Sequence, residues 1–516
     1  MRCPDACRWL RCLTSVRELS VDVVVVIVAS RTAAGGPRAG PAPRYRSTTQ
    51  SLPPPPNPAQ PSATAAAALL ESWQWTAYHT EQQVKGFLQA LATVYPSTCS
   101  LQLVGRSVRG REILALEATS HADEPEDSDL RSLMADQPLF PKPIMTYIGN
   151  MHGDEDINRE VLLQLCLELC SLGGGGSAPA PLSSDVDAQQ LRPRLQALLA
   201  NTRLHIIPCM NPDMGYAAVP KRSNANGVDL NRNMWTQDFN YVAPSSNTSG
   251  AARSSAAVDW LAYGSQALQP EARAVQEWMR RYPPRLSANL HGGALVASYA
   301  QDACDTLGLV KDCPSSWAPL PRFLANVYAQ RHANMAQSED FVNGTTQGAA
   351  WYPALGSMQD WAYWSLGAHQ VTLELHAAKT LTGQTPAAIA RQLPTFYPDN
   401  RLALLRFAEM SHVGIRALLL DPSRANATLA ANVTVTLPGG SQALLFSSIQ
   451  DGLLSVLLIP GLSHSVLVQP YLPCDPDRKY APIVLELKTQ LGWDAAIAGD
   501  GLEGLGQFTL LYAQRV

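Results

Sequence analysis

Two residues with the chemistry of metal ligands lie close together in the first third of the chain. His152 and Glu155 are three positions apart in the stretch Gly-Asn-Met-His-Gly-Asp-Glu, residues 149–155. Residues three apart share one face of a helical turn, so an imidazole and a carboxylate can converge on one ion. Zinc accepts both ligand types, and a catalytic zinc takes three protein ligands and leaves one position for water. Taken alone, so short a pattern is more often a loop histidine and a solvated glutamate.

Four later stretches carry further polar groups that could act together. They are Asp-Leu-Asn-Arg-Asn (229–233), Ser-Ala-Asn-Leu-His-Gly-Gly (287–293), the segment 349–360 with Trp-Tyr-Pro and Met-Gln-Asp, and Thr-Leu-Glu-Leu (372–375). Each has an ordinary explanation as a turn, a solvated pair or a core aromatic. Glu374 is the hardest to explain in this way, because an unpaired carboxylate inside an apolar run is costly.

The apolar runs that must position these groups alternate with helical patterns. Strands are predicted at 144–151, 202–208 and 369–376, and helices at 80–94, 158–172 and 270–280. Shorter strands are expected at 101–104 and 112–118. Continuous apolar strands are typical of parallel strands buried on both faces. The pattern therefore predicts a mixed α/β sheet flanked by helices.

The five stretches, in this order, resemble the zinc metallocarboxypeptidases, and specifically the regulatory branch that contains carboxypeptidases N, E, M and D. The resemblance covers about residues 72–412, and a following transthyretin-like β-sandwich matches 413–492 in position and pattern. It implies the metallocarboxypeptidase fold, one zinc ion per chain and the release of single C-terminal residues from peptides or proteins.

The resemblance also implies the chemical roles of five residues. His152, Glu155 and His291 match the zinc ligands. Glu374 matches the general base, which takes a proton from zinc-activated water and delivers it to the leaving amine. Arg222 would polarise the scissile carbonyl and stabilise its developing negative charge.

Substrate-binding roles follow in the same way. Asn231 and Arg232 match the pair that holds the terminal carboxylate, for which a planar guanidinium gives bidentate recognition. Tyr352 would close over the bound residue, and Asp229 would orient a zinc-bound imidazole, most simply His152. Asp302, eleven residues after His291, matches the pocket acid and implies a preference for terminal Arg or Lys.

Some residues depart from the family's pattern. Met214 precedes Gly215, Gly356-Ser357 replaces a glycine pair, and Ala300-Gln301 replaces a proline-aromatic pair beside Asp302. These departures leave loop shape and fine specificity open, and Asp302 could instead be a loop acid next to Cys304 and Asp305.

The rest of the chain divides by composition. Residues 1–30 predict a signal peptide, with an Arg-rich organellar transit peptide as the alternative. Residues 31–70 are rich in Pro and Ala and predict a disordered linker. Short strand patterns between turn residues predict a β-sandwich over 413–492, and 493–516 is expected to be a tail without a membrane anchor.

Charge and cysteine content narrow the classes of function. A net charge of −4 provides no basic surface for nucleic acid. Ten cysteines are few for this length; Cys304 and Cys313 could pair, whereas Cys166 and Cys170 are as easily free core thiols. Sequons occur at residues 247, 343, 426 and 432 and fit a secreted glycoprotein.

The sequence therefore predicts a secreted zinc carboxypeptidase with a preference for basic C-termini. The first alternative is a binding protein of the same fold that has weak or no catalysis. The second is an adhesion module in which the Pro-rich segment and the β-sandwich are the working parts, but it leaves the five clustered motifs unexplained.

Overall fold

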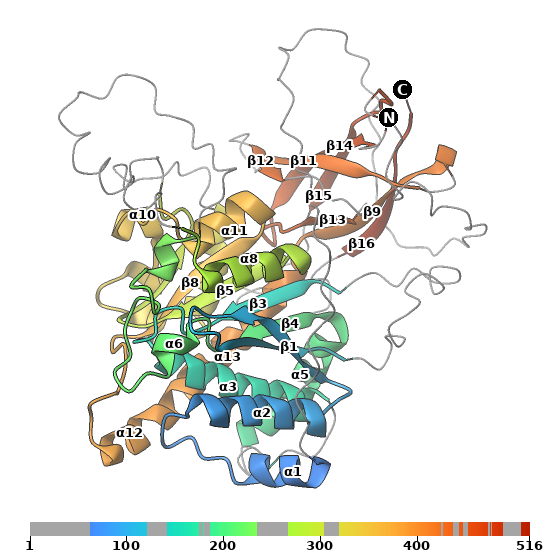
Figure 1. Cartoon of the computed structure of the whole chain (residues 1–516). Coiled ribbons are helices and arrows are strands. Elements are labelled where there is room, and N and C mark those ends of the chain that lie inside the picture. Colours follow the sequence, from blue (N-terminus) through green and yellow to red (C-terminus); the bar gives the residue numbers. More distant parts are fainter. Residues whose placement is uncertain are drawn as a thin grey trace, which may run out of the picture.

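Eight strands form one mixed sheet in the order β1-β2-β4-β3-β5-β8-β6-β7 (Figure 1). The central strands β4, β3, β5 and β8 are parallel. β1 and β2 are antiparallel to each other, β2 is antiparallel to β4, and β6 is antiparallel to β8 but parallel to β7. The bounds are β1 Cys99–Arg106, β2 Glu112–Ala118, β3 Ile144–Ile148, β4 Arg203–Ile207, β5 Leu286–His291, β6 Ala294–Tyr299, β7 Thr345–Gln347 and β8 His369–His376. The predicted mixed α/β sheet is confirmed, and its four parallel strands account for the continuous apolar runs.

The computed structural model describes most of the chain. The described residues are 62–120, 142–174, 179, 186–234, 267–303, 319–424, 427–436, 443–446, 453–472, 475, 477–488 and 507–515. The predicted signal peptide, most of the predicted linker and the Cys304–Cys313 pair lie outside them.

Helices cover both faces of the sheet. One face packs against α2 (Glu81–Val94), α3 (Ile157–Glu168), α5 (Val186–Asn201), α9 (Pro319–Ala329) and α13 (Phe396–Glu409). The other face packs against α8 (Pro270–Arg281) and α11 (Met358–Leu366). The remaining helices are α1 (Ala63–Glu71), α6 (Pro212–Gly215), α10 (Gly348–Trp351) and α12 (Pro386–Gln392), with a π-helix, η3 (Leu169–Gly173), after α3. Short 3₁₀ turns are η4 Leu230–Arg232, η6 Met335–Gln337, η7 Val342–Gly344, η8 Leu393–Thr395, η9 Met410–His412 and η10 Pro422–Arg424.

Local sequence explains where α2 begins and which side it buries. Thr80 caps the helix and forms a reciprocal capping box with Gln83. Val84, Phe87 and Leu91, at helical spacing, are buried against the sheet. The expected helix at 80–94 therefore matches α2 closely.

Two predicted boundaries need correction. Residues 63–70, assigned to the linker, belong to α1, whose residues Ala66 and Leu70 are buried. Alanine is the best helix former, so this alanine-rich run forms a helix although its composition resembles that of the preceding linker. The expected tail contains β16 (Gln507–Tyr512), which pairs in parallel with β9 (Ile415–Asp421).

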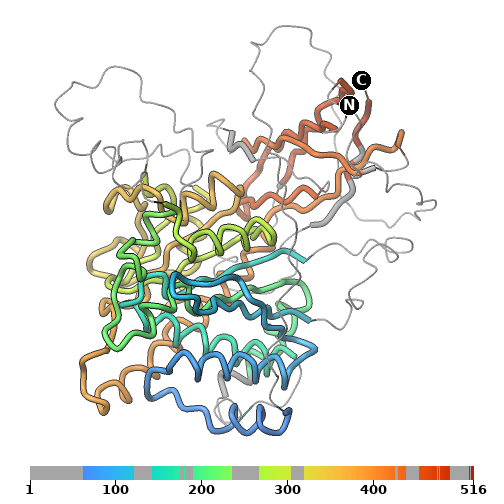
Figure 2. Tube along the Cα trace, in the orientation of Figure 1, coloured from blue at the N-terminus to red at the C-terminus, as the bar shows by residue number. Residues whose placement is uncertain are grey.

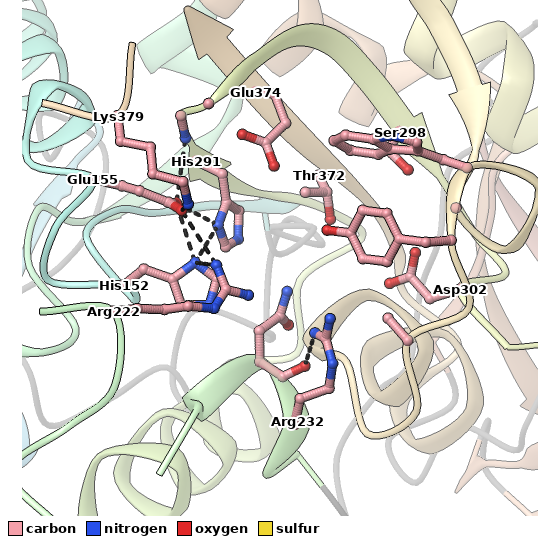
Figure 3. A pocket seen from close by; sticks show the side chains of 17 residues that line it. His152, Glu155, Arg222, Arg232, His291, Ser298, Asp302, Thr372, Glu374 and Lys379 are labelled. Atoms are coloured by element: carbon pink, nitrogen blue, oxygen red, sulfur yellow. Dashed lines mark hydrogen bonds and ion pairs between the residues drawn. The ribbon is translucent and has the colours of Figure 1, made fainter. Parts of the chain in front are cut away.

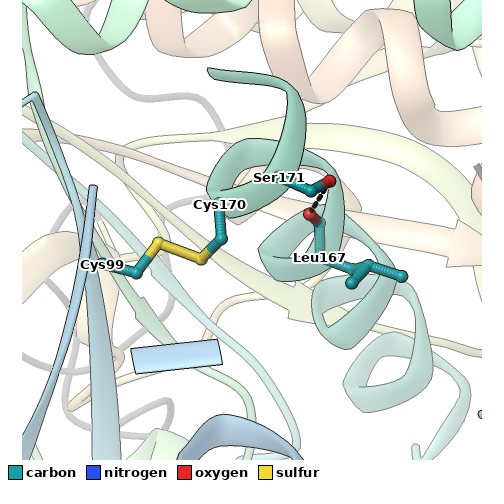
Figure 4. Close-up of a disulfide and its surroundings, with 4 residues drawn as sticks. All are labelled: Cys99, Leu167, Cys170 and Ser171. Carbon is teal, nitrogen blue, oxygen red and sulfur yellow. Dashed lines mark hydrogen bonds between the residues drawn. A yellow bond between two sulfur atoms is a disulfide. The ribbon is translucent and has the colours of Figure 1, made fainter. Parts of the chain in front are cut away.

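A disulfide joins Cys99 at the start of β1 to Cys170 in η3 (Figure 4). Among the described residues, Cys166 and Cys209 are free and buried. Cys166 is thus a free core thiol, which was one of the possibilities left open by the sequence. Cys170, for which the same possibility was left open, is in the disulfide.

Two four-stranded sheets follow the α/β unit and enclose a separate apolar core. One contains β10-β9-β13 with β16 beside β9, and the other is β12-β11-β14-β15. Their remaining bounds are β10 Ala427–Thr428, β11 Ala430–Thr436, β12 Ala443–Phe446, β13 Leu453–Val456, β14 Ser463–Tyr471 and β15 Ile483–Lys488. We call this part the all-β unit.

The all-β unit is joined to the α/β unit by buried contacts. Arg285, just before β5, donates hydrogen bonds from Nη2 to the backbone oxygens of Val413, Ile415 and Val456 at 2.7, 3.2 and 2.7 Å. Leu457 and Ile459 belong to the same apolar cluster as α2 and α3. The Cα trace in Figure 2 shows the two units side by side. Among the described residues, no helix has the length and apolar character needed to cross a bilayer.

Candidate metal and substrate site

The carboxyl ends of three neighbouring parallel strands bring the first group of polar side chains together. His152 follows β3, His291 ends β5, and Glu374 lies near the end of β8 directly opposite His291 in the register. β3 is shorter than the predicted 144–151 because the chain turns at Asn150, which has a φ of 51°. The Asn150 side chain donates to the backbone oxygen of His152 at 2.8 Å, and this bond helps to hold the turn in place.

Three buried side chains present ligand atoms to one point. The Nδ1 atoms of His152 and His291 are 3.0 Å apart, and Glu155 Oε2 is 3.1 and 2.8 Å from them. This is the one His/Cys/Asp/Glu group with metal-binding spacing among the residues that the structure describes. Figure 3 shows the three side chains meeting at one side of the pocket.

Burial and the neighbouring charges set the protonation of this group. Burial lowers the pKa of His291 to about 4, so its imidazole is neutral near pH 7. Burial also acts to lower the pKa of His152, but Glu155 and Asp229 outweigh it and raise the value. Burial disfavours the Glu155 anion, yet the two histidines hold the pKa of its carboxyl well below the usual range.

Charged side chains surround the three ligand atoms. Asp229 Oδ1 lies 3.0 Å from His152 Nε2, on the side of the ring away from His291. Arg222 donates from Nε to Asp229 Oδ2 at 3.0 Å, and its Nη1 is 3.4 Å from Glu155 Oε1. Lys379 Nζ is 2.7 Å from the same Glu155 oxygen. Asp229 thus lies where it can fix the orientation of the His152 ring.

Glu374 faces the same cavity. Its Oε2 is buried and has no hydrogen bond among the described residues. Burial, reinforced by the Glu155 carboxylate, raises the pKa of Glu374 to about 8. A carboxylate with a raised pKa in a cavity is suited to accept and return a proton near neutral pH.

A pocket of about 150 Å³ connects the three ligand atoms to Asp302. Asp302 is only 8% exposed, and its Oδ1 accepts a 2.6 Å hydrogen bond from Gln359 Nε2. Gly348 makes room for this carboxylate, since a Cβ at that position would lie 1.8 Å from Oδ1. Burial raises the pKa of Asp302 to about 6, against the opposing effects of Ser357, Arg232 and Gln359.

The ligand set and its geometry fit a zinc ion. Two imidazole nitrogens and one carboxylate oxygen are the donors that catalytic zinc uses. With the neutral His291 ring, two Nδ1 atoms at 3.0 Å need a proton or a cation between them. The donor set is therefore one that a divalent ion would complete.

Comparison with known proteins decides the family. The family model for zinc carboxypeptidases matches residues 84–403, more than half of the chain. The chain belongs to the zinc carboxypeptidase family. Zinc is therefore its cofactor, and the His152–Glu155–His291 group is consistent with binding it. The resemblance predicted from the five motifs is confirmed.

Individual relatives lie in the branch predicted from the sequence. Human carboxypeptidase D is 32% identical over 375 residues, which cover 69% of this chain and 23% of that protein. The chain thus spans about a quarter of the length of that relative. The human carboxypeptidase N catalytic chain is 33% identical over 389 residues, covering 71% and 75% of the two chains. The crystal structure of carboxypeptidase A from Helicoverpa armigera aligns with 67% of this chain and 78% of that chain, with a TM-score of 0.43 and 18% identity.

The remaining predicted residues line the other walls of the zinc carboxypeptidase's pocket. Asn231 accepts a 2.8 Å hydrogen bond from the Met358 backbone through Oδ1, and Arg232 donates to the Asn231 backbone oxygen at 2.8 Å. The Arg232 guanidinium lies over the Tyr352 ring, 5.9 Å from its centroid, and Tyr352 is 43% exposed. All nine residues predicted for the metal and the substrate line this one pocket.

Thr372 and Lys379 are among the pocket residues that were missed from the sequence. Thr372 donates from its backbone N and from Oγ1 to Gln359 Oε1, at 3.1 and 2.9 Å, and so fixes the amide that contacts Asp302. Lys379 lies in the loop after β8, where no spacing pattern distinguishes it from a solvated lysine. Thr372 could have been found from the alternation of side chains along β8, which places it on the same face as Glu374.

Proposed function

We propose that the chain is an active exopeptidase that releases single C-terminal residues, preferably Arg or Lys, from peptides or proteins. One observation carries this proposal. A buried carboxylate, Asp302, lies at the end of the same pocket that holds the His152–Glu155–His291 group and Glu374. The pocket has therefore both the ligands for the cofactor and a counter-charge for a basic side chain.

In this proposal, the substrate is held at both ends of its last residue. Arg232, with Asn231 beside it, binds the terminal carboxylate through its planar guanidinium. The side chain of the last residue enters the Asp302 end, and Tyr352, which is partly exposed at the mouth, covers it. The scissile carbonyl then lies between Arg222 and Glu374.

Bound zinc would supply a Lewis acid for the carbonyl and would lower the pKa of the attacking water. Glu374 accepts the proton of that water, for which its unpartnered Oε2 is available. It then passes the proton to the nitrogen of the departing residue, so that the amine leaves neutral. Arg222 stabilises the negative charge that develops on the carbonyl oxygen.

The same geometry supports activity over the alternative of a weak or inactive binding protein. Burying an unpaired carboxylate costs on the order of several kcal/mol. A protein that has lost catalysis would gain nothing in return for that cost. Glu374 is such a group, and it faces the metal ligands.

Selectivity in this proposal arises from an unpaired charge. A terminal Leu or Phe would leave the Asp302 carboxylate buried without a cation, which costs on the order of several kcal/mol. Each ~1.4 kcal/mol is a tenfold change in an equilibrium constant, so basic residues should be preferred by orders of magnitude.

The test compares four peptides that differ only in their last residue: Arg, Lys, Leu or Phe. The wild type should cleave the first two with much the higher kcat/KM, and a strong chelator should abolish cleavage. Asp302→Asn, which keeps the shape, and Asp302→Ala should both lose the basic preference. A wild type that prefers Leu or Phe, or a basic preference that survives both substitutions, would overturn the assignment.

We further propose that the protein is a secreted glycoprotein whose all-β unit, which includes β16 beyond residue 492, is a transthyretin-like domain. Two of the four sequons lie in described residues, at Asn343 and Asn432, and both asparagines are exposed. A buried disulfide also suits an oxidising compartment. Expression in animal cells should yield protein in the medium whose electrophoretic mass falls on N-glycosidase treatment. Retention in an organelle without glycan would favour the transit peptide.

A further inference from the structure

Lys379 is a charged pocket residue that the proposed reaction does not use. Its side chain is 43% exposed, and Nζ lies 2.7 Å from Glu155 Oε1. It lines the same pocket as Asp302. Figure 3 shows Lys379 beside Glu155 on one side of the pocket and Asp302 on the opposite side, with Glu374 between them.

Three pocket residues, Thr372, Glu374 and Lys379, follow one another along β8 and the loop after it. Thr372, which binds the Gln359 amide next to Asp302, comes first, and Glu374 follows two residues later. The strand ends at His376, and Lys379 lies beyond it. A strand advances about 3.3 Å per residue. Asp302, Glu374 and Lys379 therefore lie in that order along one axis of the pocket.

The loop that carries Lys379 is held in place. Gly293 has a φ of 118°, and a Cβ there would lie 3.0 Å from Lys379 Cε. Farther along the loop, Leu381 N donates to Tyr78 Oη at 3.0 Å, and Thr382 Oγ1 donates to Asp156 Oδ2 at 3.1 Å. The lysine stem thus leaves a fixed backbone and packs over Gly293, two residues after the His291 ligand.

We propose that Lys379 selects the substrate residue immediately before the scissile bond, favouring Asp or Glu there and disfavouring Arg or Lys. This inference rests on the proposed function. If the last side chain points to Asp302 and the scissile carbonyl lies beside Glu374, the preceding residue extends toward Lys379. Successive side chains of an extended peptide point in opposite directions, so the preceding side chain faces away from Asp302.

The charges at this end of the pocket favour an acidic side chain. Arg222 lies on the same side, with Nη1 3.4 Å from Glu155. The Glu155 carboxylate, in turn, is engaged by His152 and His291. Lys379 is partly exposed, so one ion pair with it should change the rate by roughly two- to fivefold, as surface pairs do. Attraction of an acid and repulsion of a base together should give a ratio of roughly tenfold.

The experiment measures kcat/KM for acetyl-Gly-X-Arg with X as Glu, Ala or Lys. The wild type should follow the order Glu, Ala, Lys, and the Glu/Lys ratio should shrink as salt is added. Lys379→Met should bring the ratio close to one. Lys479→Met, which removes an exposed lysine from the all-β unit, should keep it. Loss of zinc or of folded protein scales all three rates equally, so the ratio reports substrate selection alone.

A second measurement does not depend on turnover. In a Glu374→Gln background, the binding constants of the three peptides by calorimetry should show the same order, and adding Lys379→Met should remove it. Equal kcat/KM for the three peptides in the wild type, or an unchanged ratio in Lys379→Met, overturns this inference and leaves the proposed function intact. If the wild type cleaves no Arg-ending peptide, the proposed function fails and this inference fails with it.

Discussion

Two buried carboxylates in the same pocket differ in what surrounds them. Glu374 Oε2 has no hydrogen-bond partner among the described residues, whereas Asp302 is held by the Gln359 amide. A group that must exchange protons needs a free oxygen, while a group that must bind a cation needs a fixed position. This difference in partners separates the proposed base from the proposed specificity residue, although burial raises the pKa of both.

The role of Glu374 can be tested by an isosteric change. Glu374→Gln removes the proton acceptor and keeps the size, so kcat should fall by about 10²- to 10⁴-fold, the typical contribution of general base catalysis. Zinc content by atomic absorption should stay near one ion per chain, because the three ligands are untouched. Near-normal turnover in this variant would show that another group is the base.

The pKa of Asp302 predicts how selectivity depends on pH. With the value raised to about 6, the carboxyl is charged at pH 7.5 and becomes neutral as the pH falls below 6. The kcat/KM for an Arg-ending peptide should therefore fall on acidification relative to a Leu-ending peptide. The ratio of the two removes effects on Glu374 or on the metal ligands, since both peptides share them. A ratio that is flat from pH 5 to 8 would contradict the prediction, and Asp302→Asn should make it flat.

Residues within the recognised motifs were placed well from the sequence, whereas Lys379, which lies outside them, was not. His152, His291 and Glu374 could be expected to meet because parallel strands end at one edge of a sheet. Lys379 could not, since its position depends on a turn after β8 and on the space above Gly293. The contact between Gln359 and Asp302 was also missed, because it joins residues 57 apart through side chains.

At the scale of elements, helix α3 contacts the turn that carries His152. The π-helix η3, which follows α3, is joined to β1 by the disulfide. Arg159 in α3 donates from Nη1 to Asn150 Oδ1 at 3.1 Å, next to the turn that carries His152. At its far end the helix widens into η3, where Cys170 reaches Cys99. Strand and helix bounds were largely predictable from periodicity. The pairing of Cys170 with a residue 71 positions earlier was not, because it depends on how α3 crosses the sheet.

Removal of the disulfide should destabilise the fold without altering the site. A crosslink across 71 residues restricts the unfolded chain by about 4 kcal/mol in the loop-entropy model. The double variant Cys99→Ala/Cys170→Ala should lose about that much free energy of unfolding in urea. Cys166 is a nearby buried free thiol, so Cys166→Ala is the matched control. Because its volume change is small, this variant should lose only about 1 kcal/mol of free energy of unfolding. If the two variants are equally stable, the crosslink does not form in the native protein.

For the whole molecule, the junction between the α/β unit and the all-β unit is tight. Gly414 has a φ of 89°, and a Cβ there would lie 2.2 Å from the Val456 backbone oxygen. Arg285 is buried at the same place, where it donates to three backbone oxygens. The sequence showed a change in composition near Gly414 but not this contact, since a buried arginine before an apolar strand has no recognisable pattern.

Deletion of the all-β unit should therefore harm folding more than chemistry. A chain ending after His412 loses Leu457 and Ile459 from the main apolar cluster, and Arg285 loses every acceptor that the structure shows for its Nη2 among the described residues. Leaving a buried charged donor unsatisfied costs about 1–3 kcal/mol or more, in addition to the lost apolar burial. We expect a low soluble yield and a lower melting temperature, while the soluble fraction keeps a kcat close to that of the full chain, because every pocket residue precedes the cut. A truncated protein with the yield, melting temperature and activity of the full chain would show that the two units fold independently.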